Sequence, residues 1–264
     1  MDVVKVEDQA LLTRRDGDRS APPIVCVNAL GTDLRVWDRL TPYLVDRFHV
    51  VRFDLRGQGL STLGDGPLDL DRLAADLALL MDQLDTGPAI VAGMELGALV
   101  ALTLSRVRPE LAAGLALIGG GCRLDTAASW RERARRVEAG GLADIADATL
   151  AEWLPDAFRS RLPDEARIWR NMLVRSLPAG YVAGCHALAD GDATAAAAAV
   201  HVPSLVVAGD RSSAARRDAA RLLAVTIPAA ETADIRDAAL LALVTQPGPV
   251  AAAMSAFAEH HGLG

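Results

Sequence analysis

The sequence predicts an α/β fold in which a mostly parallel sheet is flanked by helices and carries a helical insertion. Three observations support this prediction. Short β-branched runs alternate with longer stretches of helical periodicity. A glycine-flanked turn, GMELG, joins one predicted strand to a helix, and one long segment has helical composition with no strand candidate. With 51% hydrophobic and 23% charged residues, the chain of 264 residues can build a large core.

Six apolar runs bounded by turn residues are the strand candidates. They span residues 22–30, 49–59, 87–94, 111–121, 203–210 and 231–238. Helices are expected at 34–47, 68–85 and 95–107, and Asp69 or Asp71 is the expected N-cap of the second of these.

The segment from residue 123 to 200 breaks this alternation, because it is helical by composition throughout. An insertion between two parallel strands lies over the carboxyl ends of the strands, where α/β proteins bind their ligands. We therefore divide the chain into an α/β core of residues 1–122 and 201–264 and a helical lid of residues 123–200.

The composition argues against several classes of partner. A net charge of −7 and a pI near 5.2 do not favour nucleic acid or an anionic membrane. The N-terminus lacks the pattern of a signal peptide, and no apolar run reaches the length of a membrane span.

Cys26, Cys122 and Cys185 have no metal-site spacing and are expected to be buried and reduced. We expect a cytoplasmic protein that binds a small molecule without a cofactor, and a homodimer is left open.

Glu95 is the one ionisable residue in the apolar stretch from residue 89 to 104. An isolated buried carboxylate costs several kcal/mol or takes up a proton. Its position between Gly93 and Gly97, where a strand turns sharply into a helix, suggests that the turn projects it into a site.

The GMELG turn resembles the nucleophile elbow of the α/β-hydrolases, with Glu95 where G-x-S-x-G has serine. The segments NALGTDLRVWD, VRFDLRGQGLS, GYVAGCHAL and VPSLVVAGD also follow in the order of the 3-oxoadipate enol-lactonase-like branch. This resemblance covers nearly the whole chain. It implies a helical lid and, as substrate, a small cyclic ester that carries a carboxylate.

The resemblance also implies that the catalytic triad is substituted. Glu95 stands at the serine position, Ser212 at the aspartate position three residues after Gly209, and Leu240 at the histidine position. The backbone amides of Leu30 and Leu96 would still form the oxyanion hole, since side chains do not supply it.

Further residues are candidates for contacts with a ligand. His186 on the last lid helix is a candidate proton partner for Glu95, although a lone helical histidine is more often structural or solvated. Thr32 and Asp33 follow the oxyanion turn, and Asp33 is equally suited to cap a helix. Trp130 and Trp153 either line the pocket or pack within the lid.

The other histidines are assigned no role in the site. His49 and His201 flank strands and are expected at the surface or at an edge, and His260 and His261 are expected to be solvated at the C-terminal tail. No metal-ligand spacing is present, so no metal site is expected.

Three functions fit these features. The first expectation is a non-hydrolytic enzyme (an isomerase, lyase or cyclase) that acts on a small oxygenated or anionic molecule with Glu95 as acid or base. The alternative is a catalytically silent pseudo-hydrolase that binds a small ligand. The third is an enol-lactonase-like hydrolase. A carboxylate nucleophile at Glu95 is the weaker enzymatic variant, because no histidine would assist hydrolysis of the ester intermediate.

Overall fold

A central eight-stranded sheet organises the chain, and the computed structural model describes residues 1–264. The strands are β1 (Asp2–Val6), β2 (Gln9–Asp16), β3 (Pro23–Val27), β4 (His49–Phe53), β5 (Ala89–Met94), β6 (Ala112–Ile118), β7 (Ser204–Gly209) and β8 (Glu231–Ile235). Their order is β1-β2-β4-β3-β5-β6-β7-β8, and every neighbouring pair from β4 to β8 is parallel. The predicted fold class is confirmed.

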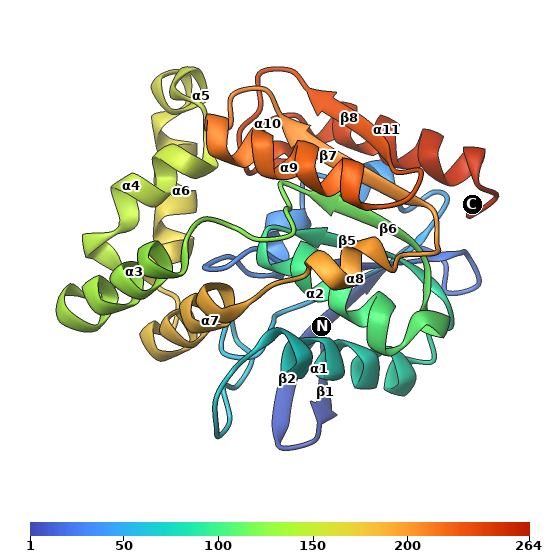
Figure 1. The fold of residues 1–264 in the computed structure, drawn as a ribbon, viewed down its shortest axis with the longest axis horizontal. Coiled ribbons are helices and arrows are strands. Elements are labelled where there is room, and N and C mark those ends of the chain that lie inside the picture. The colour runs from blue at the N-terminus through green and yellow to red at the C-terminus, as the bar shows by residue number, and fades with distance from the viewer.

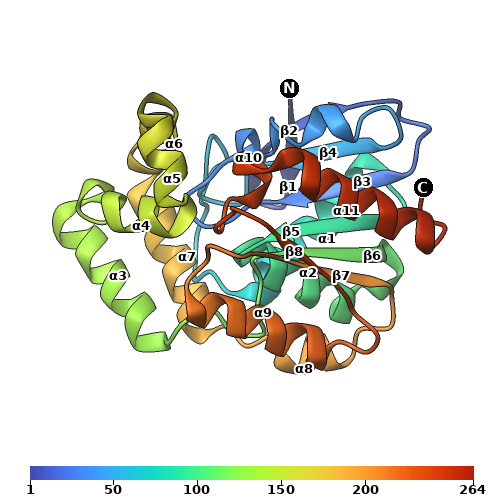
Figure 2. The same cartoon turned by 90° about the horizontal axis from the view of Figure 1, so that it is seen from above.

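Helices cover both faces of this sheet (Figures 1 and 2). One face carries α1 (Leu70–Leu84), α2 (Leu96–Val107), α8 (Thr194–Ala198) and α9 (Ala214–Thr226), each in contact with the next. The other carries α10 (Ala242–Thr245), α11 (Pro247–His260) and the short 3-10 helices η1 (Leu34–Trp37) and η2 (Thr41–Tyr43). A third 3-10 helix, η3 (Pro109–Leu111), precedes β6.

The segment between β6 and β7 contains helices and no strand, and all of its helices except the last project beyond one end of the sheet (Figure 1). It contains α3 (Ala127–Gly140), η4 (Leu142–Asp144), α4 (Ala146–Trp153), α5 (Asp156–Arg161), α6 (Pro163–Val174), α7 (Pro178–Asp190) and α8. Helix α3 packs on α7, and α4 packs on α6. Helix α8 falls inside the predicted lid range but packs on α2 and α9 of the core.

The structure corrects two local expectations. Residues 34–47 do not form one helix but two 3-10 turns, and Pro42 lies in the first turn of the second one, where no backbone N–H is needed. Residues 2–16 form the antiparallel pair β1–β2, which the sequence analysis did not assign. The expected N-cap Asp69 is confirmed, because its side chain accepts a hydrogen bond from the Arg72 amide.

The loop after β4 supports the turn after β3. Asp54 accepts hydrogen bonds from the amides of Leu34 (2.7 Å) and Leu60 (2.8 Å) and is 1% exposed. The side chain of Gln58 accepts a bond from the Gly31 amide at 3.0 Å. Together these contacts fix the backbone next to Leu30.

Two further expectations are met by the structure. All three cysteines are buried and free of disulfides. None of the helices combines the length and the apolar character that crossing a membrane requires.

Asp54 should make stability depend on pH. Burial raises the pKa of Asp54 to about 6, against the lowering effect of its two amide donors. The folded protein therefore holds this proton between about pH 4 and pH 6, where the unfolded chain has lost it, so stability falls as pH rises through this window. The loss from this group is about 3 kcal/mol, since one pKa unit corresponds to about 1.4 kcal/mol.

Urea unfolding at pH values from 3.5 to 7 measures the slope of the free energy of unfolding against pH. We expect it to be weaker in Asp54→Asn than in the wild type and unchanged in Asp46→Asn, which alters an exposed carboxyl without an ion-pair partner. An identical pH slope in Asp54→Asn and wild type would show that this carboxyl is not the source.

Candidate active site

The turn from β5 into α2 is strained. Glu95 has φ 51° and ψ −109°, a conformation that costs a non-glycine residue about 1–3 kcal/mol. A Cβ added at Gly93 would lie 2.2 Å from the Gly97 carbonyl oxygen, and one at Gly97 would lie 2.1 Å from the Val27 carbonyl oxygen. The close approach of backbone therefore requires glycine on both sides of Glu95.

The Glu95 carboxylate has a partner on each oxygen. Oε2 accepts a hydrogen bond from the Leu30 amide at 3.1 Å, and Oε1 accepts one from Nη2 of Arg216 at 2.9 Å. Glu95 is 2% exposed, so this ion pair is shielded from water. The strained turn thus directs a charged side chain toward the end of β3 and toward α9.

The ion pair is the first link of a network of four charged side chains. Nη2 of Arg216 also lies 3.2 Å from Oε2 of Glu152 on α4, and Oε1 of Glu152 accepts a bond from Nη2 of Arg133 on α3 at 2.7 Å. Nη1 of Arg133 lies 3.5 Å from the hydroxyl of Tyr181 on α7. Acid and base alternate along the network, which connects the elbow and α9 with three helices of the insertion.

The surroundings keep both arginines charged. Burial opposes the charge on Arg216, but Glu95 and Glu152 raise the pKa of this guanidinium. Burial likewise opposes the charge on Arg133, whose pKa is raised by Tyr181 and Glu152. Nη1 of Arg216 is buried without a hydrogen-bond partner, so this nitrogen of the guanidinium is an unused donor.

Two backbone amides, those predicted for the oxyanion hole, flank the elbow. The Leu30 amide donates to Glu95, as described above. The amide of Leu96, the first residue of α2, has no hydrogen-bond partner. A carboxylate oxygen of the protein itself therefore occupies one of the two donors, and the other is free.

The positions that the resemblance assigns to aspartate and histidine hold side chains without acid or base groups. Ser212 is 8% exposed, and its carbonyl accepts a bond from Arg217. Leu240 is 1% exposed and packs close to Gly119. Neither residue has a side-chain hydrogen bond to Glu95.

No histidine contacts Glu95. His186 is exposed on α7, so the structure does not bring this candidate proton partner to the carboxylate. His49 is 6% exposed, which corrects its expected place at the surface, because β4 is an interior strand of the sheet.

The four candidate ligand contacts are engaged within the protein. Thr32 donates its hydroxyl proton to the Ala29 carbonyl, and Asp33 caps η1. The indole N–H of Trp130 donates to the Leu124 carbonyl, and the side chain of Trp153 lies in the hydrophobic core. The structure brings none of them into contact with Glu95.

Most of the charged network was not predicted from the sequence. Arg216 is 121 residues from Glu95 in the chain, and nothing in its local pattern sets it apart from its neighbours. Arg133 belongs to the arginine-rich run RERARR, whose pattern does not distinguish an inward-facing arginine from solvated ones. Arg133 does reach inward, and its partner is Glu152.

Comparison with known proteins agrees with this architecture. The family model of the alpha/beta hydrolase fold matches residues 22–152. 3-Oxoadipate enol-lactonase 1 of Acinetobacter baylyi is 30% identical over 203 residues, which cover 77% of this chain and 76% of the relative. The chain belongs to the α/β-hydrolase family.

Further relatives are also hydrolases. 3-Oxoadipate enol-lactonase 2 of the same organism is 29% identical over 79% of this chain and 78% of its own. The crystal structure of the enol-lactonase from Burkholderia xenovorans LB400 superposes with a TM-score of 0.94 at 29% identity, covering 98% of this chain and 100% of that one. A thermophilic esterase from Thermogutta terrifontis gives a TM-score of 0.91 at 26% identity, with 99% of each chain covered.

These relatives overturn the first functional expectation. An isomerase, lyase or cyclase was inferred from the residue at the elbow, whereas the relatives over most of the chain are enol-lactonases and esterases. The inference failed because an altered side chain at one position does not itself specify a new reaction class. The family is one of enzymes that hydrolyse.

The Glu95–Arg216 pair should be strongly coupled in stability. Arg216→Met leaves the buried Glu95 carboxylate without its cation, which should cost about 3–5 kcal/mol. The double variant Glu95→Gln/Arg216→Met should lose less than the sum of the two single variants, because no unpaired charge remains. Urea unfolding at pH 7 measures all three.

The exposed pair Glu132–Arg135 provides the control, since Arg135→Met should change stability by less than about 1 kcal/mol. Strict additivity of the Glu95 and Arg216 substitutions would contradict the coupling.

Proposed function

We propose that this chain hydrolyses small esters or lactones with water, rather than a serine, as the nucleophile and with the Glu95 carboxylate as the catalytic base. The observation that supports the proposal is the pair of amides at the elbow. The Leu30 amide already binds an anionic oxygen, and the amide of Leu96, which follows Glu95 in the chain, is unpaired. This is the arrangement that stabilises the oxyanion formed during ester hydrolysis.

In the proposed reaction the substrate carbonyl oxygen takes the place of Glu95 on the Leu30 amide and also accepts a bond from the Leu96 amide. Glu95 remains paired with Arg216 and accepts a proton from a water molecule, whose oxygen attacks the acyl carbon. The carbon–oxygen bond to the leaving group then breaks, and Glu95 returns the proton to the leaving oxygen. Water is consumed, and an acid and an alcohol or enol are formed.

Ser212 and Leu240 are consistent with this mechanism. When water is the nucleophile, the reaction does not need a serine that is activated by a histidine and an aspartate. A substrate with a weakly basic leaving oxygen suits the site best. The enol-lactones named for the relatives are of this kind, since an enolate leaves more readily than an alkoxide. We therefore place enol esters and enol-lactones first among candidate substrates.

Access to the site requires motion. Glu95 and Tyr181 are each 2% exposed, and the charged network connects the elbow to α3 and α4. Entry of a substrate would separate Arg216 from Glu152 and move these helices away from the core.

One observation favours a second candidate, a catalytically silent protein that binds a small anion. Both carboxylate oxygens of Glu95 are engaged, so the resting site holds its own base in an ion pair. If the pair does not open, the site would hold no water to activate.

Steady-state assays with 3-oxoadipate enol-lactone, γ-butyrolactone and p-nitrophenyl butyrate test the proposal. We expect turnover of at least one substrate and a fall in kcat/KM of about 10²-fold or more in Glu95→Gln, which keeps the shape but cannot take a proton. Glu138→Gln, at an exposed glutamate of α3, should retain full activity. A fluorophosphonate probe should not label the protein.

The outcomes separate the two candidates. Turnover that is equal in wild type and Glu95→Gln would overturn the role of Glu95. Absence of turnover, together with a rise in Tm on adding a small dicarboxylate, would overturn hydrolysis and support the binding protein.

A further inference from the structure

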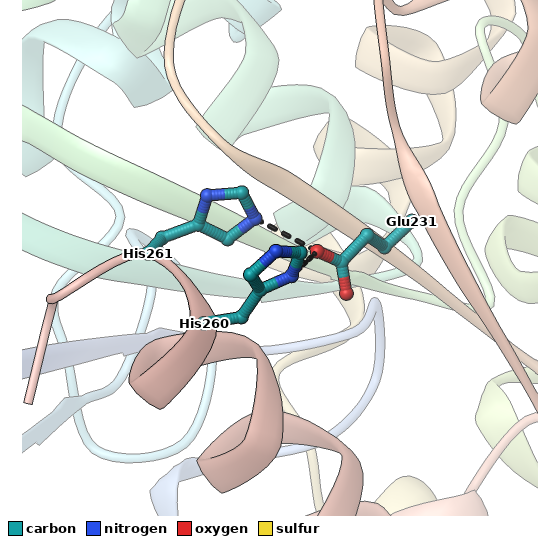
Figure 3. Close-up of side chains that lie close together, drawn as sticks. All are labelled: Glu231, His260 and His261. Atoms are coloured by element: carbon teal, nitrogen blue, oxygen red, sulfur yellow. Dashed lines mark hydrogen bonds and ion pairs between the residues drawn. The ribbon is translucent and has the colours of Figure 1, made fainter.

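A second cluster of ionisable side chains lies where the start of β8 meets the end of α11 (Figure 3). Glu231 begins β8, while His260 ends α11 and His261 follows it. Nδ1 of His260 and Nε2 of His261 each lie 2.8 Å from the same oxygen, Oε1 of Glu231. His260 is exposed, as expected, whereas His261 is half-buried, and both rings lie beside a carboxylate that β8 supplies.

We propose that Glu231, His260 and His261 form a binding site for a divalent transition-metal ion of the zinc class. The three candidate ligand atoms lie within 4.8 Å of one another. Two imidazole nitrogens and one carboxylate oxygen are ligands that Zn²⁺ prefers, whereas Ca²⁺ and Mg²⁺ require mainly oxygen ligands.

Binding an ion requires the three ligand atoms, which lie within 4.8 Å of one another, to adopt the spacing of a coordination shell. Ligands at 2.0–2.1 Å from a tetrahedral zinc ion are about 3.3 Å apart, so each nitrogen has to withdraw from Oε1 by about half an ångström. His260 is 72% exposed and His261 27% exposed, so an ion can reach the rings from solvent. A fourth position is left for water.

The ligands are held in place by their surroundings. The His261 ring contacts the Phe257 ring at a centroid distance of 5.1 Å, and the two imidazole rings are 4.6 Å apart.

The position of the cluster predicts what the ion would do. β8 is the last strand of the sheet, and Glu231 lies at its amino end, whereas Glu95 follows the carboxyl end of β5. A metal ion would join the end of α11 to this edge strand. It would stabilise the edge of the fold without entering the proposed reaction, so the two proposals stand or fall separately.

Titration calorimetry of chelator-treated protein with ZnCl₂ tests the site. We expect saturable binding of one ion per chain, and a rise in Tm in the presence of Zn²⁺. His260→Ala/His261→Ala should weaken binding by about 10-fold or more and abolish the Tm shift, and Glu231→Gln should weaken it in the same direction. MgCl₂ in excess should not compete.

The control is His186→Ala/His201→Ala, which removes the same number of histidines from exposed positions elsewhere. This variant should bind Zn²⁺ as the wild type does. The Tm of each variant without metal shows whether it is folded. Equal affinity in wild type and His260→Ala/His261→Ala, or an absence of saturable binding in the wild type, would overturn the proposal.

Discussion

The buried carboxylate of Glu95 is the constraint on which the rest of the site depends. A charge that is 2% exposed needs a counter-charge within contact distance, and α9 supplies it as Arg216. Arg216 is itself partly buried and binds a second carboxylate, Glu152, which in turn binds Arg133. One charged residue at a strained turn is thus accommodated by three more side chains, and the charges of the four balance.

This network has a mechanical consequence. Its members belong to the elbow, α9, α4 and α3, so electrostatic contacts join the core to the helical insertion. Apolar contacts can slide with little loss, whereas buried ion pairs lose most of their energy when their geometry is broken. Movement of the insertion is therefore coupled to the position of the Glu95 carboxylate, and a ligand that displaces the carboxylate also weakens the hold on α4.

Local patterns were enough to predict the fold and the elbow. The strands of the parallel sheet are β-branched runs, and the glycines at 93 and 97 occur where the backbone leaves no room for a side chain. Charged contacts between distant segments were not predictable, because Arg216 is related to Glu95 only through the packing of α9 on the sheet. The contact between Glu231 and His260 was unpredictable for the same reason. The two residues are 29 positions apart in the chain, and they come together only where α11 returns along the sheet.

The contacts of Glu95 also describe what the site is able to bind. Its carboxylate accepts one bond from a backbone amide and one from a guanidinium, and these are donors that a bound anion displacing the carboxylate would use in the same place. The Leu30 amide is backbone, so its capacity to bind a negative oxygen does not depend on which side chain stands at the elbow. Any such ligand has to compete with Glu95, which is covalently attached and already oriented. The affinity of the site for an external anion therefore depends on how much better the anion's contacts are than those of the Glu95 carboxylate. The amide of Leu96 can make the difference, because it is free and Glu95 does not use it.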